Sequence, residues 1–239
     1  MVGEPAAYSG TENLEVMAEA KNYNRYLMSL IAAQLRPGDN VLDFGAGVGT
    51  FAAELHGDGV RLVAVEPDPA LSRRLSERGI PTHRSAAPVA EASMDLVYTL
   101  NVLEHIEDDD AAAKDLARVL KSGGRLVAYV PAFNVLWTAM DDRVGHIRRY
   151  RRRGLVALLR AAGFRITYAG YVDSLGFPAS LLYRLTQNSS GEINRSALRL
   201  YDRLIFPLSR ALDRLLSRFF GKNLLVLAIK EPPAPPSRG

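Results

Sequence analysis

Three short apolar runs constrain the fold of this chain more than any other feature. They read VLDF at 41–44, RLVAVE at 61–66 and RLVAYV at 125–130. Strands that are apolar along both faces belong to parallel sheets that helices cover on both sides. Because segments of helical periodicity separate the runs, we expect an α/β fold. Its core is predicted to be a Rossmann-like, mostly parallel seven-stranded sheet with helices on both faces and a helical insertion before the last strand.

The predicted elements alternate along most of the chain. Strands are expected at residues 40–44, 61–66, 81–85, 94–100, 125–130, 164–172 and 224–230. Helices are expected at residues 21–35, 49–55, 69–78, 110–120 and 153–162.

This order divides the chain into four parts. Residues 1–36 form an N-terminal helical segment, and residues 37–172 together with 223–231 form the Rossmann-like domain. Residues 173–222 are the insertion, and the Pro-rich residues 232–239 are predicted to be a disordered tail.

Composition excludes some kinds of chemistry. The chain has no cysteine, so disulfides, thiolate metal sites and a cysteine nucleophile are ruled out. No signal-like start and no apolar run of spanning length is apparent, so we expect a cytoplasmic protein. The net charge is only +4, but arginines gather at residues 148–153 and 195–218. Such patches suit an anionic partner, although for any single patch we favour a solvated basic face.

Residues 41–50, VLDFGAGVGT, predict a strand that enters a glycine-rich turn and then a helix. Gly45, Gly47 and Gly49 let the backbone turn sharply and let a ligand approach main-chain N–H groups. In the dinucleotide-binding fingerprint the third glycine stands three positions after the second. Here that position is Thr50, and the glycine comes one residue earlier. The spacing therefore disfavours a dinucleotide.

Two carboxylates flank this turn. Asp43 lies inside the strand, where it would repel a pyrophosphate and attract a cationic, methionine-like group. Glu66 ends the next strand, where a carboxylate can accept both ribose hydroxyls of a nucleoside cofactor. Glu66 alone suits either kind of cofactor, and Asp43 distinguishes between them.

The successive stretches VLDFGAGVGT, AVEPD, MDLVYTLNVLEHI and LKSGGRLVAYVPA resemble the motifs of class I S-adenosylmethionine-dependent methyltransferases, in particular a bacterial type 11/12-like subgroup. The resemblance implies S-adenosyl-L-methionine as cofactor and S-adenosyl-L-homocysteine as product. One departure is Arg84-Ser-Ala-Ala, where the family often has an acidic residue for the adenine. The cofactor-binding residues that the resemblance implies are Tyr23, Asp43, Gly45, Ala46, Gly47, Gly49, Glu66, Pro67, Asn101 and Val102.

Methyl transfer from a sulfonium needs alignment of donor and acceptor and, for an oxygen or nitrogen acceptor, a group that receives a proton. Polar residues beyond the carboxyl edge of the sheet are the candidates. The chain also resembles a bacterial subgroup with a VPA…D…GH.RRY pattern. The loop that carries this pattern follows the fifth strand. Two interpretations of it stay open: a lid over an anionic or hydroxylated acceptor, or a salt-bridged loop that anchors the next helix. We expect Arg149 to have a structural role and His146 to belong to the acceptor site. The predicted catalytic residues are His105, Asp141, His146 and Tyr150.

A metal is not predicted. In some small-RNA and ubiquinone-pathway O-methyltransferases a Glu-x-x-Glu-His run binds a divalent metal, and the run Asn101 to His105 is similar. Asn101 replaces its first glutamate, which leaves Glu104, His105 and, from the later loop, His146. A neutral amide weakens a site for hard cations.

The insertion repeats apolar residues at helical spacing from Leu198 to Phe219, with arginines between them. Pro207 is expected to kink or divide the helix. Three readings stay open: a cap over the acceptor pocket, a homodimer face, or a basic amphipathic helix on an anionic membrane, which would place the protein at the membrane periphery.

The sequence thus predicts a methyltransferase that acts by direct displacement on an oxygen or nitrogen of a small-molecule or lipid-like acceptor. The alternatives are a non-catalytic regulatory or scaffold protein that binds the cofactor, and a nucleic-acid or protein methyltransferase. No nucleic-acid-binding module is apparent, so a nucleic-acid partner is not expected.

Overall fold

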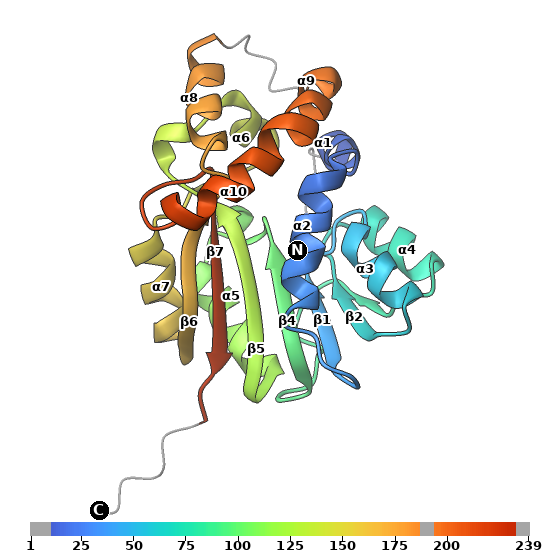
Figure 1. The fold of residues 1–239 in the computed structure, drawn as a ribbon. Coiled ribbons are helices and arrows are strands. Elements are labelled where there is room, and N and C mark those ends of the chain that lie inside the picture. Colours follow the sequence, from blue (N-terminus) through green and yellow to red (C-terminus); the bar gives the residue numbers. More distant parts are fainter. Residues whose placement is uncertain (1–10, 187–193, 233–239) are drawn as a thin grey trace, which may run out of the picture.

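The computed structural model describes residues 11–186 and 194–232. The predicted tail lies almost wholly outside the described residues. A seven-stranded sheet runs through the centre in the order β3-β2-β1-β4-β5-β7-β6, as Figure 1 shows. Only β7 runs antiparallel to its neighbours, so the predicted mostly parallel sheet is confirmed. The strands are β1 Asn40–Phe44, β2 Arg61–Val65, β3 Thr82–His83, β4 Met94–Leu100, β5 Leu120–Pro131, β6 Phe164–Val172 and β7 Asn223–Lys230.

Helices cover both faces of this sheet. One core cluster joins the sheet to α2 (Lys21–Ala32), α3 (Thr50–Gly57) and α4 (Pro69–Glu77). The other joins it to α5 (Asp109–Val119) and α7 (Arg152–Ala161). Alternate residues of each central strand belong to opposite clusters, which is why the strands are apolar along their whole length.

The strand β5 begins five residues before the predicted start at residue 125. Leu120 pairs with Met94, and the register then shifts before Leu96 pairs with Arg125. Gly123, with a φ of 77°, lies in this irregular stretch. The Lys-Ser-Gly-Gly stretch, which none of the predicted elements includes, is a bulge inside the ladder, because pairing with β4 continues on both sides of it.

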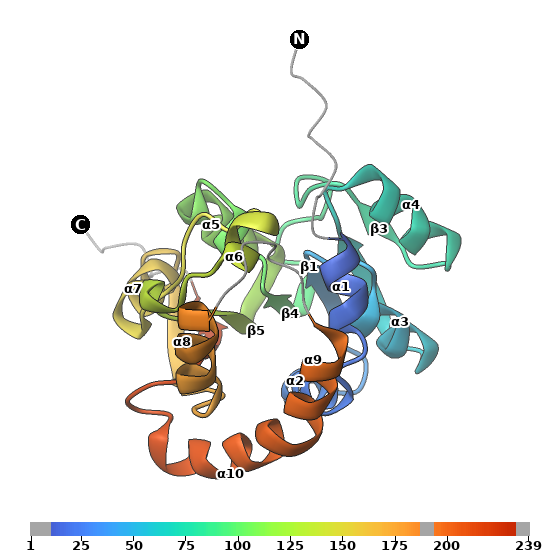
Figure 2. The same cartoon turned by 90° about the horizontal axis from the view of Figure 1, so that it is seen from above.

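The N-terminal segment contains α1 (Thr11–Met17) and α2. The loop between β5 and α7 contains η2 (Asn134–Leu136) and α6 (Ala139–Arg143), and η1 (Leu103–His105) follows β4. Figures 1 and 2 show α1, α6 and the insertion above the same edge of the sheet, at the carboxyl ends of the parallel strands.

The insertion consists of α8 (Gly176–Thr186), α9 (Arg195–Leu200), η3 (Tyr201–Ile205) and α10 (Phe206–Leu216). The element η3 is a single π-helical stretch that joins α9 to α10. Pro207 stands in the first turn of α10, where its missing N–H breaks the regular pattern of backbone hydrogen bonds. Among the described residues, no helix is long and apolar enough to cross a membrane.

Candidate functional site

A cavity of about 810 Å³ opens at the carboxyl ends of β1, β2 and β4. The chain leaves β1 toward β2 on one side and later returns to β4 on the other. Such a topological switch point separates the loops that follow the strands, and open α/β sheets bind ligands there. Because β1 pairs with both β2 and β4, the residues that follow these three strands meet at one place.

The glycine-rich turn forms one wall of this cavity. Gly45, Gly47 and Gly49 have φ values of 89°, 56° and 80°, which are strained for side chains other than glycine. A Cβ on Gly45 would lie 2.3 Å from Cγ2 of Val102. Gly45 and Gly47 line the cavity, whereas Gly49 does not. A Cβ on Gly49 would lie 2.4 Å from Cδ2 of Leu75, so this glycine lets α3 pack closely on α4.

Glu66 connects the turn to the end of β2. Its Oε2 accepts a hydrogen bond of 2.7 Å from the backbone N–H of Gly47, and its Oε1 accepts one of 2.9 Å from that of Asp68. Burial raises the pKa of the Glu66 carboxyl. The side chain lines the cavity, so one carboxylate both fixes the glycine turn and faces the space where a ligand would lie.

Asp43 is almost fully buried at the floor of the same cavity. Burial raises the pKa of its carboxyl to about 7, and the nearby charge of Glu66 adds to the effect. A cation that bound beside Asp43 would oppose this shift and favour the ionised form.

The other residues predicted to bind the cofactor also line the cavity. Asn101 follows β4 in the left-handed region with a φ of 56°, and its N–H donates to the carbonyl of Tyr129 at 2.7 Å. Arg84 and Ser85, from the stretch that lacks the family's acidic residue, lie along the wall. The remaining predicted lining residues are Tyr23, Ala46, Pro67 and Val102.

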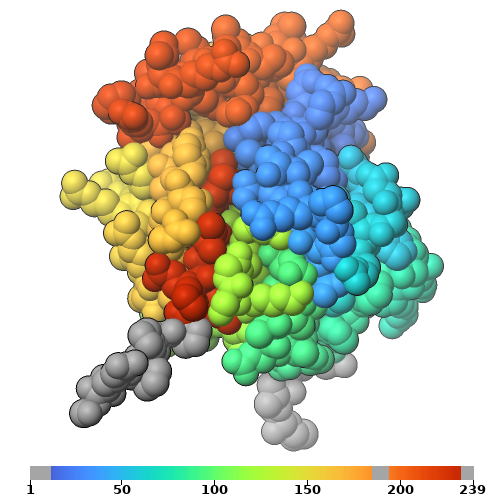
Figure 3. Space-filling view, turned by 60° about the horizontal axis from the view of Figure 1, so that its bottom comes forward, coloured from blue at the N-terminus to red at the C-terminus, as the bar shows by residue number. Residues whose placement is uncertain are grey.

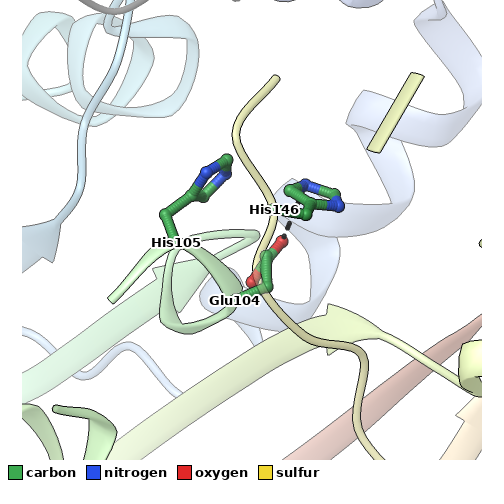
Figure 4. Close-up of side chains that lie close together, drawn as sticks. All are labelled: Glu104, His105 and His146. Atoms are coloured by element: carbon green, nitrogen blue, oxygen red, sulfur yellow. Dashed lines mark ion pairs between the residues drawn. The ribbon is translucent and has the colours of Figure 1, made fainter. Parts of the chain in front are cut away.

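Two histidines that line the cavity lie close together, as Figure 4 shows. His105 is on η1 and His146 is on the loop after α6, and their ring centroids lie 4.7 Å apart. The Nε2 of His146 lies 3.7 Å from Oε1 of Glu104. The Nδ1 of His105 lies 3.2 Å from the carbonyl oxygen of Gly145. Burial lowers the pKa of His105 to about 4, so this ring is neutral at neutral pH.

Asp141 is fully buried behind His146 and does not line the cavity. Its Oδ1 lies 2.7 Å from Nδ1 of His146, and Arg149 binds both carboxylate oxygens at 2.8 and 2.9 Å. Burial alone would raise the pKa of Asp141, but the hydrogen bonds from His146 and Arg149 hold it well below its usual range. Asp141 is therefore placed to position His146. Arg149 both anchors this loop and lines the cavity.

Tyr150 is not brought into the cavity. A bridge between Ala132 and Tyr150 holds the backbone beside the end of β5. The side chain is buried, and its hydroxyl donates to Oδ2 of Asp109 at 2.7 Å, at the start of α5. This placement assigns Tyr150 a structural role in docking the loop, in place of the predicted catalytic role.

Several cavity residues were not predicted from the sequence. Asp173 follows β6, and Lys222 and Asn223 stand at the start of β7. The backbone N–H of Lys222 donates to the carbonyl of Asp173 at 2.9 Å. Burial lowers the pKa of the Lys222 ammonium group. No sequence motif marks these residues, since it is the antiparallel pairing of β6 and β7 that brings them to the cavity.

Glu104 has an unusual environment for a carboxylate. It is fully buried, and neither carboxylate oxygen has a hydrogen-bond partner among the described residues. Burial raises the pKa of Glu104 to about 8. Together with His105 and His146 it offers three ligand atoms that all lie within 4.8 Å of one another, which is a geometry that could hold a metal ion.

The family can be assigned from comparison with known proteins. A family model described as a methyltransferase domain matches residues 18–169, which is more than half of the 239-residue chain. The chain belongs to the class I S-adenosylmethionine-dependent methyltransferases. The match covers β1 to β5 with the glycine turn, Glu66 and the two histidines, and it stops before the insertion.

Curated relatives of this methyltransferase match less than half of its length. One is an uncharacterised methyltransferase of Mycobacterium sp. (strain KMS), 33% identical over 102 residues, which are 40% of each chain. Another is a demethylmenaquinone methyltransferase of Mycolicibacterium vanbaalenii, 34% identical over 99 residues, which are 40% of this chain and 43% of that one. The matched region thus spans about two-fifths of the length of these relatives.

Solved structures share the fold over most of the methyltransferase. The [4+2]-cyclase SpnF superposes with a TM-score of 0.59 at 20% identity and covers 87% of this chain and 81% of its own. A possible histamine N-methyltransferase from Thermotoga maritima superposes with a TM-score of 0.59 at 17% identity and covers 92% and 95%. At such identities the likeness concerns the fold, and a cyclase among these structures shows that the fold does not fix the reaction.

Proposed function

We propose that this methyltransferase binds S-adenosylmethionine in the cavity and transfers its methyl group to an oxygen or nitrogen of a small-molecule or lipid-like acceptor. One observation carries the proposal. A single cavity brings together the glycine turn, the carboxylates of Asp43 and Glu66, and the pair of His105 and His146. A ligand site and a proton acceptor thus share one space.

The lining residues fit this cofactor. Gly45 leaves room where any side chain would meet Val102. Glu66 would accept the ribose hydroxyls, and Asp43 offers a buried carboxylate to a cationic group. When bound, the cofactor supplies a methyl group on a positively charged sulfur.

His146 is the residue that we propose as proton acceptor. Because Asp141 is ionised, it accepts the N–H of Nδ1, so the neutral ring has its lone pair on Nε2. Nε2 lies 3.7 Å from Oε1 of Glu104, and His146 lines the cavity. The cofactor would supply the methyl group, its carbon–sulfur bond breaking as S-adenosylhomocysteine leaves, and Nε2 of His146 would take the proton that the acceptor oxygen or nitrogen gives up. Asp141 acts through His146 and is a positioning residue.

The acceptor end of the cavity offers positive charge. Arg149 and Lys222 line it. The guanidinium of Arg149 is already occupied by Asp141. The ammonium group of Lys222 has no hydrogen bond or ion pair with any residue that the structure describes. We therefore propose an acceptor that carries an anionic group, which Lys222 would bind.

The insertion supplies the wall above the cavity, and we propose that it acts as a cap. Leu198, Tyr201 and Phe206 line the cavity from α9, η3 and α10. Phe206 packs against Tyr23 of α2, with ring centroids 5.4 Å apart. An acceptor would therefore have an apolar roof, which suits a molecule with an apolar part.

A second candidate is a metal-assisted transfer. The buried carboxylate of Glu104, which has no hydrogen-bond partner among the described residues, favours it, since two imidazoles and one carboxylate form a common ligand set for transition metals. Chelation separates the two candidates. If transfer needs no metal, activity survives dialysis against a chelator. Activity that is lost on chelation and returns with added Mn²⁺ or Zn²⁺ would establish the metal-assisted reaction.

The experiment that tests the function uses methyl-labelled S-adenosylmethionine with the purified protein and a bacterial extract. The extract is then separated into lipid, small-molecule, protein and nucleic-acid fractions. We expect label in the lipid or small-molecule fraction, and loss of that label with His146→Ala. His56→Ala, at an exposed histidine on α3, is the matched control.

Two other results would overturn the proposal. Label in the protein or nucleic-acid fraction would show that the acceptor is a protein or a nucleic acid and not a small-molecule or lipid-like compound. Tight binding of the cofactor without label in any fraction would favour a regulatory or scaffold protein that binds the cofactor without turnover.

A further inference from the structure

The helices α9 and α10, with η3 between them, bury polar residues and expose large apolar ones, which is the reverse of an ordinary surface helix. We call residues 195–219 the insertion helices. Most residues that they bury are polar, namely Asp202, Ser209 and Asp213. Large apolar side chains point outward: Leu200 is 61% exposed, Leu204 57%, Leu208 55%, Leu215 74% and Phe219 69%. A surface helix of a globular protein has the opposite arrangement.

The buried polar residues hold the insertion helices through hydrogen bonds to backbone groups of α2 and of the segment after β6. Asp202 accepts hydrogen bonds of 3.0 and 2.8 Å from the backbone N–H groups of Asn22 and Tyr23, in the first turn of α2. Asp213 accepts bonds of 3.0 and 2.9 Å from the N–H groups of Asp173 and Ser174, after β6. Phe206 is the large apolar anchor.

Leu175 completes this attachment, because its N–H donates to the hydroxyl of Ser209 at 3.0 Å. The outward leucines and Phe219 therefore contribute little to the attachment of these helices. Their presence on the surface needs another reason.

The outward apolar residues form one stripe. Leu204, Leu208, Leu215 and Phe219 are spaced so that they follow one side of the helix. Figure 3 shows the insertion helices as a continuous ridge along one edge of the molecule, beside α2. Figure 2 shows the same segment as an arc at the outside of the fold. The stripe is thus open to a large partner.

The charges beside this stripe are of one sign. Arg203, Arg214 and Arg218 are exposed and have no ion pair with any of the described residues. The carboxylates between residues 195 and 219 are those of Asp202 and Asp213, and both are buried. The outer face, defined as the stripe with these three arginines, therefore presents apolar and cationic groups without an exposed acid.

Two partners could cover such a face, a second copy of the chain or a lipid surface. A twofold dimer would place the same patch against itself and bring the arginines of both copies together. Like charges across an interface are unfavourable. An anionic bilayer instead accepts the apolar side chains below its headgroups and neutralises the arginines. The charge pattern therefore favours the bilayer.

We propose that the outer face of the insertion helices docks on an anionic lipid bilayer and holds the protein at the membrane surface. The inner side of the same helices lines the cavity through Leu198, Tyr201 and Phe206. Docking would thus set the wall of the cavity against the lipid surface. That a lipid-like acceptor enters from there rests on the proposed methyl transfer, whereas the docking itself does not.

Flotation with lipid vesicles tests the docking without cofactor or turnover. The protein is mixed with vesicles of phosphatidylcholine that contain one-quarter phosphatidylglycerol, or with vesicles of phosphatidylcholine alone. We expect flotation with the anionic vesicles, weaker flotation with the neutral ones, and release from the anionic ones by high salt.

Two double variants separate the apolar and the charged contributions. Leu208→Gln with Leu215→Gln is expected to lower the partition coefficient by about tenfold or more on both kinds of vesicle. Arg214→Gln with Arg218→Gln is expected to lower it by roughly thirtyfold on anionic vesicles alone. Arg73→Gln with Arg160→Gln, at exposed arginines of α4 and α7, removes the same charge elsewhere and should have a much smaller effect. Unchanged melting and unchanged binding of S-adenosylhomocysteine show that each variant is folded.

Three results would overturn the proposal. The first is no flotation with anionic vesicles, and the second is an equal loss of binding in the Arg73 and Arg160 control. The third is a stable dimer in light scattering that becomes a monomer in the leucine variant, since the outer face would then be a contact between two copies.

Discussion

The Nδ1 atom of His146 lies 2.7 Å from the Oδ1 atom of Asp141, and this carboxylate is fully buried. The capping box of α6 fixes Asp141 further, because its Oδ2 accepts a hydrogen bond of 2.8 Å from the N–H of Thr138. One short helix thus sets the orientation of an imidazole at the wall of the cavity. The arrangement is that of a base with its orienting carboxylate.

Replacement of this carboxylate tests the relationship. Asp141→Asn keeps the shape of the side chain but offers Nδ1 a weaker acceptor, so we expect kcat to fall by roughly tenfold to a hundredfold, less than the loss of the base itself. Binding of S-adenosylmethionine, measured by calorimetry, should not change. Asp142→Asn, at the exposed neighbouring position, is the control. An unchanged kcat in Asp141→Asn would show that this loop has a structural role alone.

Glu66 is expected to govern cofactor affinity. Glu66→Ala removes the acceptor for the ribose and frees the N–H of Gly47, so the Kd for S-adenosylmethionine should rise by about tenfold to a hundredfold. Glu77→Ala, at an exposed carboxylate of α4, should leave the Kd unchanged. If calorimetry gave equal Kd values for the Glu66 and Glu77 variants, the cofactor would bind elsewhere.

The raised pKa of Asp43 predicts a pH-dependent affinity. Its carboxyl titrates near pH 7, so it is mostly protonated at pH 6 and mostly ionised at pH 8. A cationic ligand attracts the ionised form, so affinity for S-adenosylmethionine should rise by up to about tenfold from pH 6 to pH 8. Binding below pH 7 should release a proton.

Two comparisons control this pH experiment. S-adenosylhomocysteine lacks the sulfonium charge, so its affinity should rise less over the same range. Asp43→Asn should flatten the profile for S-adenosylmethionine. A profile that is equally steep in Asp43→Asn would assign the titration to another group.

Gly45 and Gly47 provide a matched pair for the glycine turn. Both have a positive φ, so an added Cβ strains either position by about 1–2 kcal/mol. At Gly45 the Cβ would also clash with Val102, whereas at Gly47 the nearest atom is Cδ1 of Leu14 at 3.4 Å. Gly45→Ala should therefore lower the free energy of unfolding by roughly 1–3 kcal/mol more than Gly47→Ala.

Val102→Ala should restore part of this loss in the Gly45→Ala background, because it removes the clashing methyl groups. Chemical denaturation of Gly45→Ala, Gly47→Ala, Val102→Ala and the double variant of Gly45 and Val102 measures the coupling between residues 45 and 102. Equal destabilisation by the two glycine substitutions would show that the turn relaxes freely around residue 45.

The local pattern of apolar and polar residues was sufficient to predict much of the fold. The runs 41–44, 61–66 and 125–130 became β1, β2 and the second part of β5 because their apolar residues serve both core clusters. The start of β5 was missed because Lys-Ser-Gly-Gly has the composition of a turn. Pairing with β4 held it in the ladder, and a contact between strands is not visible in the local sequence.

The candidate site was predictable to the extent that it follows strands. Gly45 and Asn101 come directly after a predicted strand and Glu66 ends one, and the carboxyl ends of parallel strands meet at one edge. The loop after β5 was a different case. Whether Tyr150 or His146 faces the cavity depends on the bridge of Tyr150 to Ala132, and spacing along the chain does not contain that information.

The sequence by itself determined the order of strands and helices, the glycine turn, the absence of cysteine chemistry and the family. These depend on residue type and on spacing along the chain. The tertiary structure alone decided that Asp141 stands behind His146, that Lys222 reaches the cavity and that the leucines of α10 point outward. Each of these depends on contacts between segments far apart in sequence. In α10 the backbone donors of distant loops hold the polar side inward, against the preference that hydrophobicity alone would predict.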